Sequence, residues 1–421
     1  MEKVISMGRC LTVFVTGVLL LVGRPGGAGA QTPASIELDR SEIHGLRHTK
    51  PETILELLPR PLPDRYTEEE VREFERRIRN LSLFDSVRVA VGDRQLLVEV
   101  LEKFTLVPIV NYSSGKTDKD LDVTAGVAEY NIGGTGTKLA GIFRYTQRRP
   151  NFELSLSQHS FHPTRWAKEA NLFLNSSSFR FDDSESGWHR DRFGGDLEWK
   201  GPYRYATPLR YEVVLRAYRE ILSDASVAPP RNGYFIGIAP EAIWDRYHWH
   251  DLVPSGYRVT LELRPGYFIG PNQNRHEGRL RYLQGVPLGP ETVLMLNGVV
   301  EAVNSGNVNH SVLIGSQVGV RGLSDNLFRN RAQGYLNTEL RHAIKLAPRW
   351  ALQGVVFSDL GLFQGMDQQG NITSWTGAAN VGGGVRLIPT FLSNTLLRLD
   401  LARLVAPEQT WFFQYAITQY F

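Results

Sequence analysis

The sequence has almost no cysteine and, beyond residue 30, no long apolar run. Cys10 is the single cysteine in 421 residues, which excludes a disulfide framework and multi-cysteine metal sites. A membrane-spanning helix needs about 20 consecutive apolar residues, and no stretch after residue 30 approaches that length. The formal charge is only +3, from 47 basic and 44 acidic residues, so bulk charge gives no reason to expect a nucleic-acid partner.

Catalytic and metal-binding signatures are missing as well. No nucleophile elbow, phosphate-binding loop or paired-carboxylate motif appears, so we expect no enzymatic activity, no catalytic residue and no cofactor. The segment 248–251, His-Trp-His-Asp, has metal-ligand residue types. Its tryptophan and neighbouring aromatic residues are more typical of a girdle at a membrane interface, so we expect no metal site.

Residues 1–30 have the pattern of a secretory signal peptide. Lys3 and Arg9 precede an apolar core over 11–22, and the small residues 28–30 form a cleavage site. An uncleaved anchor is the alternative, but the apolar core is too short to span a bilayer. An exported chain without spanning helices is either soluble or a transmembrane β-barrel.

Residues 31–103 predict a small α/β domain in the order strand, helix, helix, strand, strand. We expect the first helix to be capped by Thr49 and the second by Thr67, each with a glutamate three residues later. Apolar residues recur at helical spacing in the second helix, at Val71, Phe74, Ile78 and Leu81.

Residues 104–421 predict an all-β region with no helical period. Apolar and charged residues alternate strictly, as in 209–216, so one strand face is apolar and the other is charged. This pattern favours a membrane barrel over a soluble sandwich. Sixteen strands are expected near 104–112, 120–130, 136–146, 150–161, 168–181, 190–200, 207–220, 233–245, 256–268, 275–285, 291–303, 333–345, 350–363, 376–388, 394–404 and 411–421.

An even strand number places both ends of the barrel on the side of the N-terminal domain. Short glycine and proline turns should then alternate with longer loops, such as 221–232, 304–332 and 364–375. The connection 246–255 is too long for a tight turn, so the strand boundary there is an open question.

The last strand has aromatic or apolar residues at every second position from 411 to 421, except at Gln419. It resembles the C-terminal sorting signal of bacterial outer-membrane barrels, carried here by Phe413, Tyr415, Ile417 and Phe421. The alternative is an ordinary edge strand that ends in phenylalanine.

The N-terminal domain resembles a polypeptide-transport-associated (POTRA) domain. The resemblance is carried by the turn at Gly45, the helix entry at Thr49, the bend over 83–87 and the final strand running into 101–103. Such domains bind extended chains by adding a strand to their sheet edge, which requires no particular sequence.

Three further motifs extend the resemblance to the barrel. Segment 130–136 resembles an Asn-Leu-x-Gly-x-Gly turn, with Asn131, Gly133, Gly134 and Gly136. Segment 320–323 resembles a Val-Arg-Gly-aromatic loop tip in which leucine replaces the aromatic residue, and 356–361 resembles a Phe-x-Asp-x-Gly strand. The chain resembles the outer-membrane assembly and polypeptide-transport superfamily of the BamA and TamA type (the bacterial surface antigen family), with one POTRA-like domain.

The resemblance implies a loop folded back into the barrel. Alternation places Glu339 and Asp359 on inward strand faces, and the resemblance implies that they pair with Arg321. We refer to this group as the lumen-loop lock. Its members are Val320, Arg321, Gly322, Leu323, Glu339 and Asp359.

The implied fold is a 16-stranded antiparallel transmembrane β-barrel preceded by one small α/β domain. The implied function is outer-membrane protein insertion or polypeptide translocation, with the N-terminal domain in the periplasm of a bacterial cell. The implied partners are the lipid bilayer, unfolded or extended polypeptide clients and accessory lipoproteins, and no nucleic acid. The alternatives are a passive channel or receptor, and a two-partner secretion transporter, which normally carries two POTRA domains and a plug helix.

Overall fold

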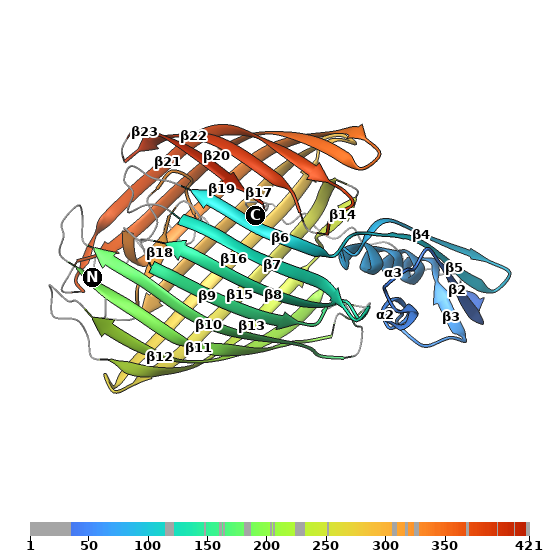
Figure 1. Cartoon of the computed structure of the whole chain (residues 1–421), viewed down its shortest axis with the longest axis horizontal. Helices are drawn as coiled ribbons and strands as arrows, with labels where there is room; N and C mark the ends of the chain where they lie inside the picture. The colour runs from blue at the N-terminus through green and yellow to red at the C-terminus, as the bar shows by residue number, and fades with distance from the viewer. Residues whose placement is uncertain are drawn as a thin grey trace, which may run out of the picture. The chain divides into compact units, whose positions relative to one another are not determined.

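The chain folds into a small α/β domain followed by a closed β-barrel (Figure 1). In the computed structural model, residues Ile36–Phe421 belong to one compact unit. The expected signal peptide and Phe421 lie outside the described residues. The structure describes residues 35–113, 122–146, 149–159, 162, 165–180, 187–202, 204, 207–223, 232–250, 252–304, 310–315, 319–323, 328–367, 370–393, 395–407 and 409–417.

The N-terminal domain contains two small sheets and two helices. In a three-stranded sheet of order β2-β5-β4, β2 runs parallel to β5, and β1 pairs separately with β3. The elements are β1 (Ser35–Leu38), β2 (Arg40–His44), α2 (Pro51–Leu55), β3 (Asp64–Thr67), α3 (Glu68–Asn80), β4 (Phe84–Gly92) and β5 (Gln95–Glu102).

Helix α3 forms as expected from its capping signal and apolar stripe. Thr67 and Glu70 form a reciprocal capping box, and Phe74 and Ile78 are fully buried in the domain core. The expected helix α2 is present, but Thr49 as its N-cap was wrong. The N-cap is Lys50, whose side chain has no hydrogen-bond acceptor and therefore makes no side-chain cap. The hydroxyl of Thr49 instead accepts a hydrogen bond from the barrel.

The barrel strands lie close to the expected spans. Within the described residues the ring has sixteen spanning strands, because β14 and β18 are three-residue pieces that pair with β15 and β19. The spanning strands are β6 (Leu106–Ser113), β7 (Asp122–Ile132), β8 (Thr137–Thr146), β9 (Arg149–Ser157), β10 (Ala167–Arg180), β11 (Gly187–Lys200), β12 (Leu209–Ser223), β13 (Gly233–Asp245), β15 (Val253–Ile269), β16 (Gln273–Pro287), β17 (Thr292–Asn304), β19 (Phe328–Ala347), β20 (Trp350–Met366), β21 (Ile372–Pro389), β22 (Leu397–Ala406) and β23 (Thr410–Ala416).

The open boundary at 246–255 is a hairpin. β14 (His248–His250) folds back on β15, with Trp249 opposite Pro254, so the connection is a continued ladder and not a loop. The strand β15 therefore starts at Val253, a few residues earlier than expected.

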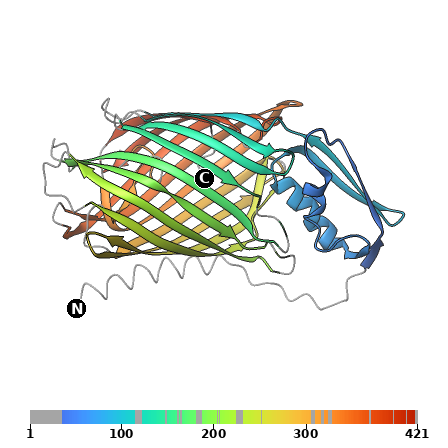
Figure 2. The same ribbon diagram turned by 60° about the horizontal axis from the view of Figure 1, so that its bottom comes forward.

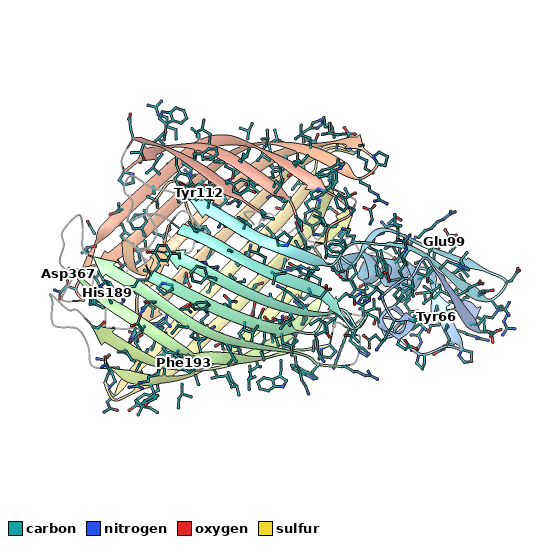
Figure 3. All side chains as sticks on the ribbon, viewed as in Figure 1. Tyr66, Glu99, Tyr112, His189, Phe193 and Asp367 are labelled. Carbon is teal, nitrogen blue, oxygen red and sulfur yellow. The ribbon has the colours of Figure 1, made fainter. Side chains whose placement is uncertain are left out.

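The barrel has an apolar outside and a polar inside. Phe193 and Tyr112 project from the outer wall (Figure 3), and Phe193 and Val356 are 68% and 67% exposed. Inward residues of neighbouring strands are polar or charged and buried, such as Asn337 and Gln353. The tilted strands close into a continuous ring (Figure 2), so the wall has the apolar-out, polar-in form of a transmembrane β-barrel. In the part of the chain that is described, neither helix is long and apolar enough to cross a membrane.

Candidate functional site

The connection from β17 to β19 enters the barrel and places Arg321 at its centre. Short strand β18 (Val312–Ile314) pairs with β19, and the turn that follows carries Gly319 and Gly322 at φ +121° and +91°. Both values lie in the left-handed region that glycine tolerates, so the chain reverses there without strain. Val320 and Leu323 are buried in an apolar cluster whose other members are Val299, Ile314, Tyr335, Phe363, Ala378 and Leu404.

Arg321 is fully buried and bonded to two strands. Its Nε and Nη2 donate to the two carboxylate oxygens of Asp359 at 2.8 and 2.7 Å, a bidentate pair. Its Nη1 donates to Glu339 Oε1 at 2.8 Å, and its main-chain N–H donates to Asp359 Oδ2 at 3.0 Å. The loop tip is therefore tied to β19 and β20 through one guanidinium group.

Asp359 is itself held by two asparagines. Asn337 Nδ2 and Asn380 Nδ2 donate to its carboxylate at 2.9 and 2.7 Å. Asn380 Nδ2 also donates to the main-chain oxygen of Arg321 at 2.7 Å. These hydrogen bonds hold the Asp359 carboxylate in place, and this carboxylate with that of Glu339 compensates the buried charge of Arg321.

Glu339 also forms ion pairs with two further arginines. Arg386 Nη2 lies 3.0 Å from Glu339 Oε1, and Arg341 lies 2.6 Å from Glu339 Oε2. Asp400 of β22 lies 3.6 Å from Arg321 Nη1. The network thus reaches from the loop across four consecutive strands, β19 to β22.

The Phe357 ring packs against one face of the Arg321 guanidinium group. The Arg321 Cζ atom lies 3.5 Å from the ring centre, which is a close cation–π contact. A side chain at Gly382 of β21 would lie 2.4 Å from Phe357 Cζ, so glycine is required for the ring to take this position.

The structure therefore brings together all six residues of the lumen-loop lock. Sequence reasoning did not single out their supporting residues, Asn337, Asn380, Arg386, Asp400 and Gly382. One signal was available for Gly382, since 382–384 is a run of three glycines in a strand, and glycine there indicates a close approach.

The β7–β8 turn joins the barrel to the N-terminal domain. Asn131 is 1% exposed, and its Nδ2 donates to Thr49 Oγ1 at 2.9 Å. The main-chain oxygen of Gly134 accepts from Lys50 N at 2.9 Å and from Thr53 Oγ1 at 2.8 Å. Gly136 N–H donates to Asn131 Oδ1 at 2.8 Å, which closes the turn.

A second contact supports the same joint. His159, which follows β9, lies 2.7 Å from Glu56 of the N-terminal domain. Burial raises the pKa of Glu56, but the hydrogen bond and the charge of His159 outweigh it, so the pKa lies below the usual 4.5. All four glycine and asparagine residues of the expected turn motif, with Gly133 at φ +59°, lie in this joint.

Strands β6 and β23 close the barrel, and we call their junction the seam. The described register pairs Tyr112 with Tyr415 and Asn111 with Ala416. Phe413 and Trp411 are exposed on the outer wall, and Tyr415 and Ile417 are partly exposed.

Pro108 of β6 presents its nitrogen to the seam. Val110 accepts from Ile417 N at 3.0 Å on the β23 side, whereas Thr105 accepts from Tyr130 N at 3.1 Å on the β7 side. Alternate residues of a strand share a bonding side, so Pro108 belongs with Val110. It has no N–H, so β6 offers no main-chain donor toward β23 at this position.

Comparison with known proteins gives a likeness of fold. No protein-family model and no curated protein matches the chain. CdiB from Acinetobacter baumannii matches with a TM-score of 0.60 at 13% identity, over 91% of this chain and 73% of that one. CdiB from Escherichia coli matches with 0.57 at 10% identity, over 94% and 92% of the two chains.

A third structure is BamA from Haemophilus ducreyi lacking POTRA domains 1–3. It matches with a TM-score of 0.53 at 13% identity, over 91% of this chain and 84% of that one. The chain has the fold of CdiB and BamA. At these identities the likeness concerns architecture, and the contacts described above belong to this chain.

Proposed function

We infer that this protein sits in the outer membrane of a bacterial cell and inserts or translocates polypeptides, and that it transports rather than catalyses. In this proposal a client is received by the N-terminal domain in the periplasm and enters the barrel wall at the seam. The observation that carries the proposal is the seam, where Pro108 leaves β6 without a main-chain donor on the edge that faces β23.

The missing donor makes the seam easier to part than a complete ladder. A net hydrogen bond contributes about 0.5–1.5 kcal/mol in water, and its loss matters more in a bilayer, where water cannot replace it. Opening β6 from β23 exposes two strand edges, and an extended client satisfies them by pairing.

The lumen-loop lock braces the wall next to the seam. Arg321 bonds to Glu339, Asp359 and, through its main chain, Asn380, which lie on β19, β20 and β21. These strands keep their register while β23 and β6 separate. In this role the lock holds the barrel in a competent shape without touching the client.

The N-terminal domain offers an edge for an extended chain. β2 is one of the two outer strands of its sheet, and a cavity of about 590 Å³ is lined by Arg40 and Ser41 of β2. Leu55, Leu58 and Leu62 give the cavity apolar lining, and its other lining residues are Glu52, Glu56, Pro61 and Arg165. A strand added at β2 would gain main-chain hydrogen bonds from the edge and contacts from these leucines, which is the POTRA-like role.

The likeness to CdiB and BamA supports a transport role and does not choose between insertion and export. The seam serves either, because a parted wall admits a strand into the bilayer or a chain into the lumen. Accessory lipoproteins are proposed partners on the resemblance alone.

A reversible disulfide across the seam tests the proposal. Asn111→Cys with Ala416→Cys places two cysteines at a directly opposed pair, and the only native cysteine is Cys10. Val110→Cys with Ala125→Cys, a pair between β6 and β7, is the matched control. Photocrosslinkers at Ile43 and Trp411 report contact with clients in cells.

We expect polypeptide crosslinks at both positions in the parent. The seam disulfide should remove the crosslinks at Trp411 and leave those at Ile43, and a reductant should restore them, whereas the control disulfide should change neither. If neither position captures a polypeptide while the purified protein conducts ions, the protein is a passive channel or receptor and the proposal is wrong.

A further inference from the structure

The barrel lumen contains a strongly basic cavity, separate from the lumen-loop lock. Its volume is about 470 Å³, and seven arginines line it against two glutamates. The arginines are Arg144, Arg190, Arg192, Arg264, Arg275, Arg279 and Arg329. They come from five different strands, so the basic character is built by the fold and not by one local segment.

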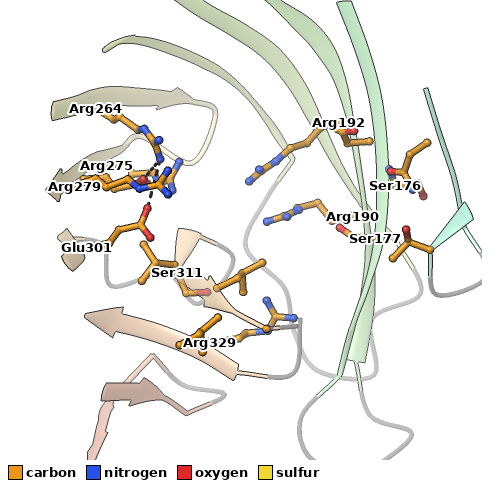
Figure 4. Close-up of a pocket in the computed structure, with 18 of the residues that line it drawn as sticks. Ser176, Ser177, Arg190, Arg192, Arg264, Arg275, Arg279, Glu301, Ser311 and Arg329 are labelled. Carbon is orange, nitrogen blue, oxygen red and sulfur yellow. Dashed lines mark hydrogen bonds and ion pairs between the residues drawn. The ribbon is translucent and has the colours of Figure 1, made fainter. Parts of the chain in front are cut away.

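The arginines face one another across the cavity. Figure 4 shows Arg190 and Arg192 of β11 pointing toward the wall that carries Arg264, Arg275 and Arg279. Arg329 of β19 and Ser311 lie between these walls. Guanidinium groups that converge from opposite walls can bind one anion from several sides.

The carboxylates of the lining do not balance this charge. Glu277 accepts from both Arg264 and Arg275, so it is shared between two arginines. Glu301 accepts from Gln333 at 2.9 Å and lies 3.5 Å from Arg264 Nη1. Both glutamates therefore lie on one wall of the cavity, where each is close to Arg264.

On the opposite wall, Arg192 Nε pairs with Glu220 at 2.7 Å, outside the cavity lining. Arg264 also bonds to Glu262, so among the described residues four carboxylates, those of Glu277, Glu301, Glu220 and Glu262, contact the seven arginines of the lining. Ser177 and Ser311 add hydroxyl groups to the lining.

We propose that this cavity binds a water-soluble, multivalent oxyanion of the phosphate or pyrophosphate class. Arginine forks match tetrahedral oxyanions bidentately, and a multivalent anion offsets the mutual repulsion of like charges held in a confined space. A phosphate carried by a lipid does not fit, because the closed wall separates the cavity from the outer apolar surface. The site is independent of the function proposed above.

The test uses the full-length protein in detergent micelles and inorganic pyrophosphate as the probe. Calorimetry at low salt should show saturable binding that weakens steeply as KCl is added, because the contacts are ionic. Arg279→Gln and Arg190→Gln should each weaken binding at least tenfold. Arg279→Lys keeps the charge but loses the fork, so we expect an intermediate affinity.

Arg281→Gln is the matched control. Arg281 follows Arg279 at the next inward position of β16, donates to Asn297 Oδ1 at 2.9 Å and does not line the cavity. This variant should lose much less affinity for pyrophosphate than Arg279→Gln, because the Arg281 side chain does not line the cavity. Gel mobility of unheated samples checks that every variant forms a closed barrel.

Two results would overturn the proposal. One is the absence of saturable pyrophosphate binding to the folded parent. The other is an equal loss of affinity in Arg281→Gln and Arg279→Gln, which would show a diffuse lumen charge and no site. In planar bilayers, the parent should also favour chloride over potassium, and Arg190→Gln with Arg279→Gln should shift the reversal potential toward cation selectivity.

Discussion

The guanidinium group of Arg321 lies 3.5 Å above the ring of Phe357 while it bonds to carboxylates on two strands. Phe357 belongs to β20 and faces the lumen two residues before Asp359, so one strand supplies both the ring and a carboxylate. The arginine is held in its plane by Glu339 and Asp359 and from one face by Phe357. Together these contacts fix the position of Arg321, and with it the loop tip, in the lumen.

Removing the arginine should destabilise the barrel strongly. We expect Arg321→Ala to lower the free energy of unfolding by about 3–5 kcal/mol, because Asp359 loses its bidentate partner in a buried site. Arg321→Glu should be worse, since it adds a third carboxylate. Denaturant unfolding of the lipid-reconstituted protein, followed by tryptophan fluorescence, measures the change.

A double-mutant cycle identifies the origin of that loss. Arg321→Ala combined with Asp359→Ala should cost less than the sum of the single variants, because the second change removes the stranded charge. Arg403→Ala, an exposed arginine on β22, should change stability by no more than about 0.5 kcal/mol. Strictly additive losses would contradict the coupling.

Gly382 should not tolerate a methyl group. A Cβ atom there would lie 2.4 Å from Phe357 Cζ and 2.5 Å from the Leu401 oxygen, so the ring must leave the guanidinium plane. We expect Gly382→Ala to cost about 1–3 kcal/mol in the same unfolding experiment. Gly354→Ala on β20 is the control, because nothing lies within 4 Å of its Cβ position. Equal behaviour of the two variants would show that the ring is not constrained.

Two of the three glycines of the β7–β8 turn, Gly133 and Gly134, should behave differently. Both have positive φ, but a Cβ at Gly134 would lie 2.3 Å from the His48 oxygen, whereas none lies near Gly133. Gly134→Ala should therefore loosen the N-terminal domain, and Gly133→Ala should show only the backbone strain. Hydrogen exchange of residues 48–53 in the full chain measures the difference, and equal protection in both variants would contradict the docking contact.

Low pH should release the segment that precedes α2. Burial raises the pKa of Glu102, but hydrogen bonds from Thr49 and from the main-chain N–H groups of 47–49 outweigh it, so the pKa lies below 4.5. A depressed carboxyl pKa stabilises the fold above the unfolded value, and the contribution is lost as pH falls through the folded value.

We expect hydrogen-exchange protection of His48 and Thr49 to hold above about pH 5 and to fall toward pH 3. Glu102→Gln keeps the side-chain shape and removes the titration, so its protection should be lower and independent of pH across this range. A parent with constant protection down to pH 3 would contradict the role of the carboxylate.

Sequence alternation predicted which side chains face inward, and the strand spans follow from it. It placed Glu339 and Asp359 on lumen faces correctly, because the side-chain period of a strand is two. It could not say which inward residues meet. Asn380 reaches Asp359 because β20 and β21 pair at that register, and register depends on the geometry of the turns.

Tertiary contacts also decided the elements that were missed. Thr49 has the residue type of an N-cap, yet its hydroxyl serves Asn131 of the barrel, a partner 82 positions away in sequence. β3 is four residues long and is held by pairing with β1, so its own sequence carries too little alternation to predict it.

The two donors on the Gly134 oxygen have a mechanical consequence. The turn that accepts them joins β7 to β8, and β7 is the immediate neighbour of β6, the first strand of the seam. The N-terminal domain is thus bonded to one end of β7, the strand that forms the first hairpin of the ring with β6. A force on that domain would therefore act first on β7 and β6, and on the opposite edge of β6 Pro108 provides no main-chain donor to β23.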